Sequence, residues 1–490
     1  MRFRCFKGEK SISHSFLAAF SPTMLHKNTK IFSIFIFEFP LFMKPVNHNS
    51  LNKTGPSLVM YIDMNSYFAS CEQQCEERLR NKPIGVCPYD GPNAVVIAAS
   101  KEAKKFGIRT GMHASQCKIL CPGFEMVPTR PFLYRRIHVQ IMNILCFYCD
   151  AESVIPKSID EAIINLTSYT YIHKDPIALA RQIKTDIRNT VGEYITCSIG
   201  IAANVFLAKL ATEIQKPDGL VHITPENIDH YLGKLSLTDI PGIARAGEKR
   251  LNRAGIYTPI DFRNASEPLL RKVFGGVVGN YWYYRLHFKE VDLSTTNYKR
   301  MSAMRSLSAR TRASYETLHA MFVSLCTRLE QRLVKQNVFC RELSFYAGYY
   351  NAVEWKTNIK LAYPLQDAME MLHQVAFKIA EYEKLQPLKI LRRDMMSMGL
   401  VVGDFVPSEK LQYSLFDNRA QQDRLRKIMY TIKDQYGKNM VRKASETIEA
   451  GQMKDAIGFG SVKDLYQSGN TGFNKFLLEE DKEMQVAPDR

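Results

Sequence analysis

Short apolar runs alternate with amphipathic stretches along residues 58–232 of this chain. Apolar runs of strand length predict buried strands at 58–63, 84–87, 94–99 and 196–201. Apolar positions at helical spacing predict helices at 66–77, 132–148, 176–190 and 209–215. The segments 151–156 and 162–166 flank a turn and predict a hairpin. This alternation, with parallel and antiparallel connections both open, indicates a mixed α+β domain.

The pattern changes after residue 232. Residues 233–287 predict short helices punctuated by glycines, and the polar, basic stretch 288–300 predicts a linker. The next hundred residues predict four strands at 301–309, 340–350, 353–361 and 391–402, with helices at 314–337 and 365–383. This β-α-β-β-α-β order is a split βαβ arrangement. Residues 404–490 predict a polar tail with one helix around 419–436.

The composition is that of a basic globular protein. Lys and Arg number 66 against 49 Asp and Glu, so the formal net charge is +17. Such a surface predicts a polyanionic partner, either nucleic acid or an acidic membrane. No apolar run reaches the roughly 18–20 residues of a membrane span. The 11 cysteines predict reduced thiols in a cytoplasmic protein, and the pair Cys146 and Cys149 leaves a zinc site as the weaker alternative.

Residues 1–57 differ from the rest of the chain. Their apolar run at 31–37 is broken by Glu38 and Pro40 and is too short to cross a bilayer. Basic residues precede this run, which leaves a signal peptide as an alternative. We expect an upstream extension outside the fold, with Met43 as the natural start.

Three carboxylates stand at the ends of apolar segments. Asp63 ends the first predicted strand, and Asp160 and Glu161 lie in the predicted hairpin. Carboxylates so placed are costly unless they are hydrated, paired or bound to metal, and hard oxygen ligands suit Mg²⁺. A pair of such ions can drive phosphoryl transfer. The alternative is that these residues are only turn residues or helix caps.

Several motifs resemble those of the Y-family translesion DNA polymerases. YIDMNSYFAS at 61–70 resembles the opening motif of that family, and SIDE at 158–161 resembles its central catalytic motif. AASKEAKKFG at 98–107 is similar to the fingers motif. The end of the palm motif is matched by SIGIA at 198–202, LAKLA at 207–211 and KPDG at 216–219. The motifs occur in family order and are most similar to the bacterial DNA polymerase IV type, with the polymerase V catalytic subunit type as the alternative subclass.

The resemblance implies a role for each matching position. Asp63, Asp160, Glu161 and the backbone carbonyl of Met64 would hold two Mg²⁺ ions. Phe68 matches the steric gate that excludes ribonucleotides, although ordinary core packing would also explain it. The expected ligands of the incoming dNTP triphosphate are the lysines Lys216, Lys104 and Lys101. The last two replace Tyr and Arg of relatives, and without the family context Lys216 would be read as a surface lysine.

The resemblance also implies DNA contacts. IPGIARAG at 240–247 resembles a helix-hairpin-helix, in which a glycine-rich turn binds a DNA phosphate, although Ala244 replaces the second glycine of the motif and a plain helical hairpin is the alternative. The candidate DNA contacts are Gly242, Gly247, Lys249, Arg300 and Arg305.

A short peptide in the tail resembles the clamp-binding motif of bacterial polymerases. QYSLF at 412–416 would dock on the sliding clamp through Gln412, Leu415 and Phe416. Exposed apolar residues in a polar tail are typical of a binding site for another protein.

Together these motifs imply a right-hand polymerase of the α+β class. It would have a ferredoxin-like palm (58–232) with fingers inserted at about 67–132, a thumb (233–287), a linker (288–300), a little finger (301–403) and a clamp-binding tail (404–490). We expect a monomer that binds primer–template DNA and dNTPs, interacts with no membrane and copies damaged DNA with low fidelity. A non-catalytic scaffold at lesions and another two-metal nucleotidyl transferase, such as a cyclase, are the alternatives.

Overall fold

The structure is a computed structural model that describes residues 57–293, 299–351, 353–386, 388–413, 418–436 and 440–441. The N-terminal extension expected at 1–57 lies outside the described residues except for its last position. Within the described ranges, no helix combines the length and apolar character that crossing a membrane requires.

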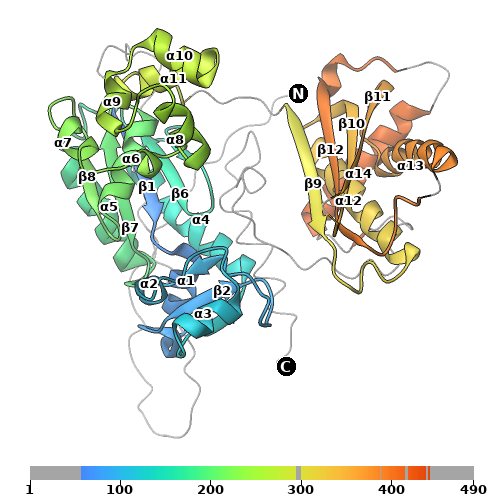
Figure 1. Ribbon diagram of the computed structural model, residues 1–490, viewed down its shortest axis with the longest axis horizontal. Helices are drawn as coiled ribbons and strands as arrows, with labels where there is room; N and C mark the ends of the chain where they lie inside the picture. Colours follow the sequence, from blue (N-terminus) through green and yellow to red (C-terminus); the bar gives the residue numbers. More distant parts are fainter. Residues whose placement is uncertain are drawn as a thin grey trace, which may run out of the picture. The chain divides into compact units, whose positions relative to one another are not determined.

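A five-stranded sheet forms the centre of residues 58–232, the part expected to be the palm and called the palm below (Figure 1). Its strands, in spatial order, are β5 (Val154–Pro156), β6 (Glu161–Asn165), β1 (Val59–Met64), β7 (Cys197–Ala202) and β8 (Leu220–His222). β1 is antiparallel to both of its neighbours, whereas β7 and β8 are parallel. The palm helices are α1 (Tyr67–Cys75), α4 (Pro131–Tyr148), α5 (Pro176–Thr190) and α6 (Val205–Ile214).

The two faces of β1 belong to different hydrophobic cores. Met60 and Ile62 pack in the core that includes α4 and α5. Val59 and Tyr61 pack in the core that includes α6 and the thumb. Because side chains alternate along a strand, Asp63 shares the face of Val59 and Tyr61 and is directed to the side of α6.

The fingers form a small sheet of their own. The strands run in the order β3 (Ala98–Ala99), β2 (Ile84–Cys87) and β4 (Glu125–Pro128), and η1 (Glu77–Leu79) precedes them. Two short helices complete this part, α2 (Lys101–Lys105) and α3 (Ala114–Leu120). Only Ala98 and Ala99 of the strand expected at 94–99 pair in the ladder, because Val95 instead forms an isolated bridge with His113.

The thumb consists of short helices, as the glycine spacing predicted. They are η2 (Leu237–Asp239), α8 (Arg245–Asn252), α9 (Pro259–Asn264), α10 (Glu267–Phe274) and α11 (Val277–Leu286), and α7 (Ile228–Leu232) directly precedes them. Its core is aromatic: the Trp282 ring lies 5.4 Å from Phe206 of α6, 5.5 Å from Phe262 and 5.7 Å from Phe274. The Phe206 contact packs the thumb onto the palm.

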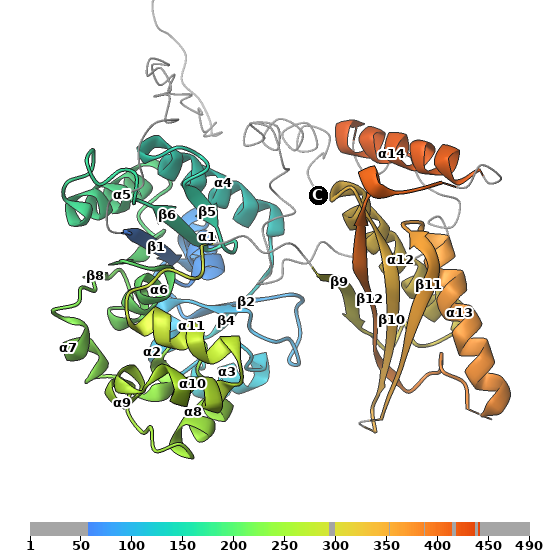
Figure 2. The ribbon, with the colours of Figure 1, turned by 90° about the horizontal axis from the view of Figure 1, so that it is seen from above.

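The little finger has the predicted β-α-β-β-α-β order (Figure 2). Its four antiparallel strands, in spatial order, are β11 (Glu354–Leu365), β10 (Val338–Tyr349), β12 (Met395–Pro407) and β9 (Arg300–Ser306). α12 (Tyr315–Lys335) and α13 (Ala368–Leu385) pack on one face of this sheet. The short η3 (Ser408–Lys410) follows β12.

A further helix, α14 (Arg419–Tyr436), packs against α12 through polar side chains (Figure 2). Arg426 is 6% exposed and bonds Asp367, the N-cap of α13, at 3.0 Å. Tyr430 donates to Glu330 of α12 at 2.9 Å, and Glu330 is fully buried. The helix expected at 419–436 is therefore confirmed, and its buried ion pairs attach it to the little finger.

Candidate active site

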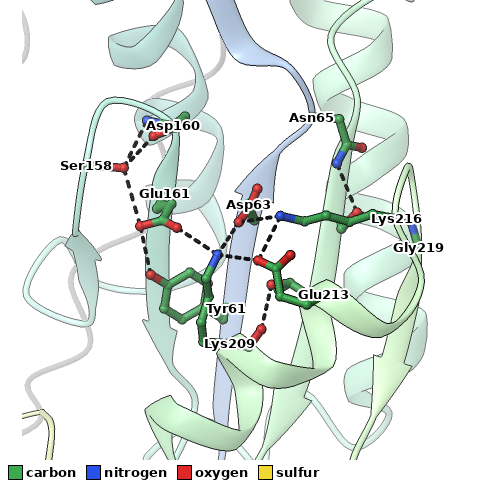
Figure 3. Close-up of polar contacts among 12 residues, drawn as sticks. Tyr61, Asp63, Asn65, Ser158, Asp160, Glu161, Lys209, Glu213, Lys216 and Gly219 are labelled. Carbon is green, nitrogen blue, oxygen red and sulfur yellow. Dashed lines mark hydrogen bonds and ion pairs between the residues drawn. The ribbon is translucent and has the colours of Figure 1, made fainter. Parts of the chain in front are cut away.

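Asp63 and Glu161 face each other across two neighbouring strands (Figure 3). In the antiparallel ladder of β1 and β6, Asp63 pairs with Glu161 just as Tyr61 pairs with Ile163. Directly opposed residues place their side chains on one face, with Cβ atoms about 4.5–5.5 Å apart. The register of the sheet therefore brings two of the three predicted carboxylates together.

Asp160 belongs to the hairpin that precedes β6. Its backbone carbonyl accepts from the Met64 N–H at 2.9 Å, and its side chain accepts from the Ser158 hydroxyl at 2.5 Å. Burial, together with the nearby Glu161 and Asp63 carboxylates, raises the pKa of Asp160 above its ordinary value. A cation would relieve this repulsion, although among the described residues no three carboxylate, His or Cys side chains are grouped so as to hold a metal ion as they stand.

His138 holds the same hairpin through a hydrogen bond from α4. It lies on α4, is 1% exposed and bonds the carbonyl of Ile159 through Nδ1 at 2.8 Å. Burial lowers the pKa of His138 to about 4. The ring is therefore neutral at pH 7 and donates its Nδ1–H to the carbonyl, which positions the residue directly before Asp160.

Lys209 of α6 reaches into the carboxylates from the neighbouring helix (Figure 3). Its ammonium forms an ion pair with Asp63 and lies 2.8 Å from Glu161 Oε1 and 2.9 Å from Glu213 Oε1. Although burial opposes its charge, Asp63 and Glu161 raise the pKa of Lys209 above its ordinary value.

The close approach of α6 depends on Gly200 of β7. A Cβ atom at this position would lie 2.0 Å from the backbone oxygen of Ala208. Any side chain there would push the helix, and Lys209 with it, away from the sheet.

Lys216 approaches Asp63 from the turn that follows α6. Its ammonium lies 3.0 Å from Asp63 Oδ2 and 2.9 Å from Glu213 Oε1. The turn is tied to the end of β1, because Asp218 N–H donates to Asn65 Oδ1 at 2.7 Å. Lys216 therefore lies at the carboxylates, and its contact with a dNTP stays a prediction.

The two finger lysines differ in their surroundings. Lys104 is exposed, yet desolvation and, to a lesser extent, the Lys216 ammonium lower its pKa. The Lys216 ammonium and the Asp63 carboxylate thus both act electrostatically on Lys104, and its contact with a triphosphate stays a prediction. Lys101, in the first turn of α2, is half-buried.

Phe68 lies on α1, five residues after Asp63. It is 3% exposed, and its ring stacks on Tyr134 of α4 with the centroids 4.5 Å apart. The packing alternative is thus correct in itself, but it does not remove the predicted gate function. A ring held between α1 and α4 is rigid, as a steric gate must be.

The donor set of this site fits Mg²⁺. Asp63, Asp160 and Glu161 offer carboxylate oxygens, which are the ligands this ion prefers. Two of these side chains already share one ammonium, so they can converge on a single cation. The backbone carbonyl of Met64 stays a predicted ligand.

The predicted DNA contacts of the thumb lie around α8. Gly242 adopts φ +90° in the turn before this helix, where a glycine is favoured. Gly247 lies within α8, and Lys249 is exposed on it. Ala244, which replaces the family's second glycine, occupies the N-cap of α8.

The little-finger contacts lie on opposite faces of the sheet. Arg300 is exposed at the start of β9 and bonds Glu342 of β10 at 3.2 Å. Arg305 pairs with Met398 and shares the parity of the buried Met301, which puts it on the face that α12 and α13 cover. Arg300 therefore lies on the opposite face, called the open face below, and Arg305 does not.

The clamp motif is described only at its start. Gln412 is exposed, and burial together with Asp423 of α14 raises the pKa of Tyr413 to about 12. Leu415 and Phe416 lie outside the described residues.

Sequence reasoning missed three residues of the site. Lys209 was part of the LAKLA motif but received no role, and Glu213 and His138 were not considered. A spacing of four and then three residues separates Lys209, Glu213 and Lys216. This spacing places the three side chains on one side of a helix and its C-terminal turn. That spacing was the available signal. No comparable pattern marks His138.

Two parts of the chain match models of one protein family. Residues 62–213 match the impB/mucB/samB family, and residues 298–415 match the C-terminal domain of that family. The two ranges together cover more than half of the chain.

Curated relatives and a solved structure agree with this match. The DNA polymerase IV of Vibrio vulnificus is 28% identical over 57% of this chain and 81% of its own length. That of Bacteroides fragilis is 28% identical over 68% of this chain and 90% of its own length. A solved Y-family DNA polymerase chimera superposes with a TM-score of 0.60 at 23% identity, over 71% of this chain and 99% of the other. The chain therefore belongs to the impB/mucB/samB family and has the fold of the Y-family DNA polymerases, which confirms the resemblance drawn from its motifs.

Proposed function

We propose that this protein is a template-directed DNA polymerase of the translesion type, which extends a primer 3′ end with dNTPs. The observation that carries the proposal is the pairing of Asp63 with Glu161 across the central strands, with Asp160 beside them. Relatives named DNA polymerase IV, matched over most of their length, support the same activity.

Asp63, Asp160 and Glu161 would hold two Mg²⁺ ions, together with the Met64 carbonyl. When bound, the ions supply charge neutralisation for an in-line displacement at the α-phosphate of the dNTP. The chain's own contribution is to orient the carboxylates. Ser158 fixes Asp160 at 2.5 Å, and Tyr61 donates to Glu161 Oε2 at 3.0 Å.

The lysines supply the charge that a triphosphate needs. Lys216 and Lys104 lie close enough for the first to lower the pKa of the second. Two neighbouring ammonium groups repel each other, and an inserted polyphosphate relieves that repulsion. Lys101 stays a weaker proposal, since no contact supports it.

Phe68 is the proposed steric gate. A ring that is 3% exposed and stacked on Tyr134 cannot move aside at low cost. A 2′-hydroxyl placed against it would clash, so the site would reject ribonucleotides.

The open face of the little-finger sheet is suited to a nucleic-acid backbone. One row of paired residues crosses all four strands and consists of Asn358, Ser344, Val401 and Ser302. Such small side chains allow a DNA backbone to approach the sheet closely, and Arg300 adds positive charge on the same face. With Gly242, Gly247 and Lys249 in the thumb, these contacts would bind phosphates without reading sequence.

Primer extension in Mg²⁺ tests the proposal. The wild type should extend a primed template, and Asp160→Ala should abolish extension while it leaves DNA binding intact. Asp90→Asn, which changes an exposed carboxylate of the fingers, should extend like the wild type. DNA binding without extension by the wild type would favour the scaffold, and primer-independent release of pyrophosphate would favour a cyclase.

The clamp proposal rests on the QYSLF peptide and needs its own test. Deleting residues 412–416 should abolish stimulation by a bacterial sliding clamp and leave basal extension unchanged. Loss of both would contradict a pure docking role.

A further inference from the structure

Lys209 uses the same oxygens that the proposed metal ions need. Its ammonium bonds Asp63 Oδ2 and, at 2.8 Å, Glu161 Oε1. These two carboxylates belong to different strands, so the ammonium bridges them as a cation would. An ammonium and a divalent ion cannot both occupy the position between these oxygens. Binding of one must therefore weaken binding of the other.

Lys209 is well held in this position. Its stem rises from α6, which Gly200 allows to lie directly on β7. The ammonium also lies 5.2 Å from the centre of the Tyr61 ring, and Tyr61 in turn donates to Glu161 at 3.0 Å. The side chain is 21% exposed, so water screens its ion pairs only in part.

Glu213 gives Lys209 a second partner that is not a predicted metal ligand. The two residues are one helical turn apart on α6, with Nζ 2.9 Å from Glu213 Oε1. Lys216 shares Glu213 at 2.9 Å and Asp63 at 3.0 Å. An ammonium displaced from Asp63 and Glu161 can thus stay paired with Glu213 and does not become an isolated buried charge.

We propose that Lys209 is a tethered counter-ion that competes with divalent metal for Asp63 and Glu161 and moves onto Glu213 when the metal binds. Lys209 is then a positioning residue, which keeps the carboxylates together and sets the metal concentration that the site requires. This inference rests on the proposed function only in naming the metal, because the competition itself needs neither DNA nor dNTP.

Binding of Mn²⁺ to the full chain, followed by the electron paramagnetic resonance signal of the free ion, measures the competition directly. Mn²⁺ takes the same hard oxygen ligands as Mg²⁺. Lys209→Met should lower the Mn²⁺ dissociation constant about tenfold, which corresponds to about 1.4 kcal/mol. Lys157→Met removes an equal charge from the exposed part of the catalytic hairpin and should change the constant by less than about twofold.

Amine labelling of the wild type gives a second readout that does not depend on a variant folding. Lys209, identified by mass spectrometry, should react slowly without divalent metal and faster when Mg²⁺ is added, because Mg²⁺ removes two of its three carboxylate partners. Glu213→Gln removes the third, so the increase on adding Mg²⁺ should be larger in that variant.

The proposal is overturned if Lys209→Met binds Mn²⁺ as weakly as the wild type, or more weakly. It is also overturned if Mg²⁺ leaves the labelling of Lys209 unchanged. Primer extension by the wild type separates this failure from that of the proposed function. A wild type that extends primers but shows no competition refutes only the role of Lys209. A wild type that shows competition but extends no primer refutes only the polymerase.

Discussion

Replacing Phe68 by alanine tests the sugar gate and its packing at once. Phe68 is 3% exposed and stacks on Tyr134 at 4.5 Å and 25°. Truncating a buried Phe typically costs about 3–5 kcal/mol of folding stability. Stacking accounts for about 0.5–1.5 kcal/mol of such a loss. Chemical denaturation should show a loss in this range.

The gate function predicts a separate kinetic effect. Forcing an extra atom into a packed site costs about 1–3 kcal/mol, which corresponds to a rate factor of roughly 5 to 150. Phe68→Ala should therefore raise the efficiency of ribonucleotide insertion relative to deoxyribonucleotide insertion by that factor. Single-nucleotide primer extension with matched rNTP and dNTP pairs measures the ratio.

A core truncation elsewhere controls for general loosening. Ile141 lies on α4 in the same hydrophobic cluster as Phe68 and is 1% exposed. Ile141→Ala should cost about 2–5 kcal/mol and leave the sugar ratio unchanged. The gate assignment fails if Phe68→Ala leaves the ratio unchanged, or if Ile141→Ala shifts it equally.

Three further changes have definite expected outcomes. Burial lowers the pKa of His138 from its ordinary 6.5 to about 4 in the folded protein, so between these pH values only the unfolded chain binds the proton. Stability should therefore fall by about 1.4 kcal/mol for each unit by which the pH is lowered from 6.5 to 4. In His138→Gln, urea midpoints measured across this range should lose that slope. Arg426→Met removes a cation that pairs with the fully buried Glu330 and should cost about 3–5 kcal/mol by denaturation, with part recovered when Glu330→Gln is added; no recovery would argue against the pair. Gly200→Ala should cost about 1–3 kcal/mol and slow primer extension by displacing α6, whereas Gly123→Ala, with no atom within 4 Å of the added Cβ, should do neither.

The strand-end carboxylates could be predicted because they follow from local pattern. An apolar run that ends in Asp63 and a hairpin that contains Glu161 needed only one antiparallel register to meet. The order of elements in the little finger followed from periodicity in the same way. The predicted bounds of these strands and helices differ from the observed ones by a few residues. The strand predicted at 391–402, for instance, is β12 and ends at Pro407.

The burial of charged side chains between packed elements could not be predicted. Lys209 reads as an ordinary surface lysine until β7 and α6 are packed together. The sequence of α14 is likewise polar, and its buried face carries Arg426 and Asp423 in place of the apolar residues that periodicity detects. Charges that pair between distant segments leave no signal in one sequence, because each partner is hydrophilic on its own.

The attachment of α14 limits the reach of the peptide before it. Residues 411–418 connect η3 to α14, and both elements belong to the little finger. A strap of eight residues fixed at both ends can extend about 14 Å from its anchors, half of its contour length. Gln412 is only the second residue after η3, so a sliding clamp held at Gln412 would stay within about 7 Å of that element. Cutting the chain directly after residue 416 would leave six residues beyond Lys410, and the freed end could then extend about 20 Å.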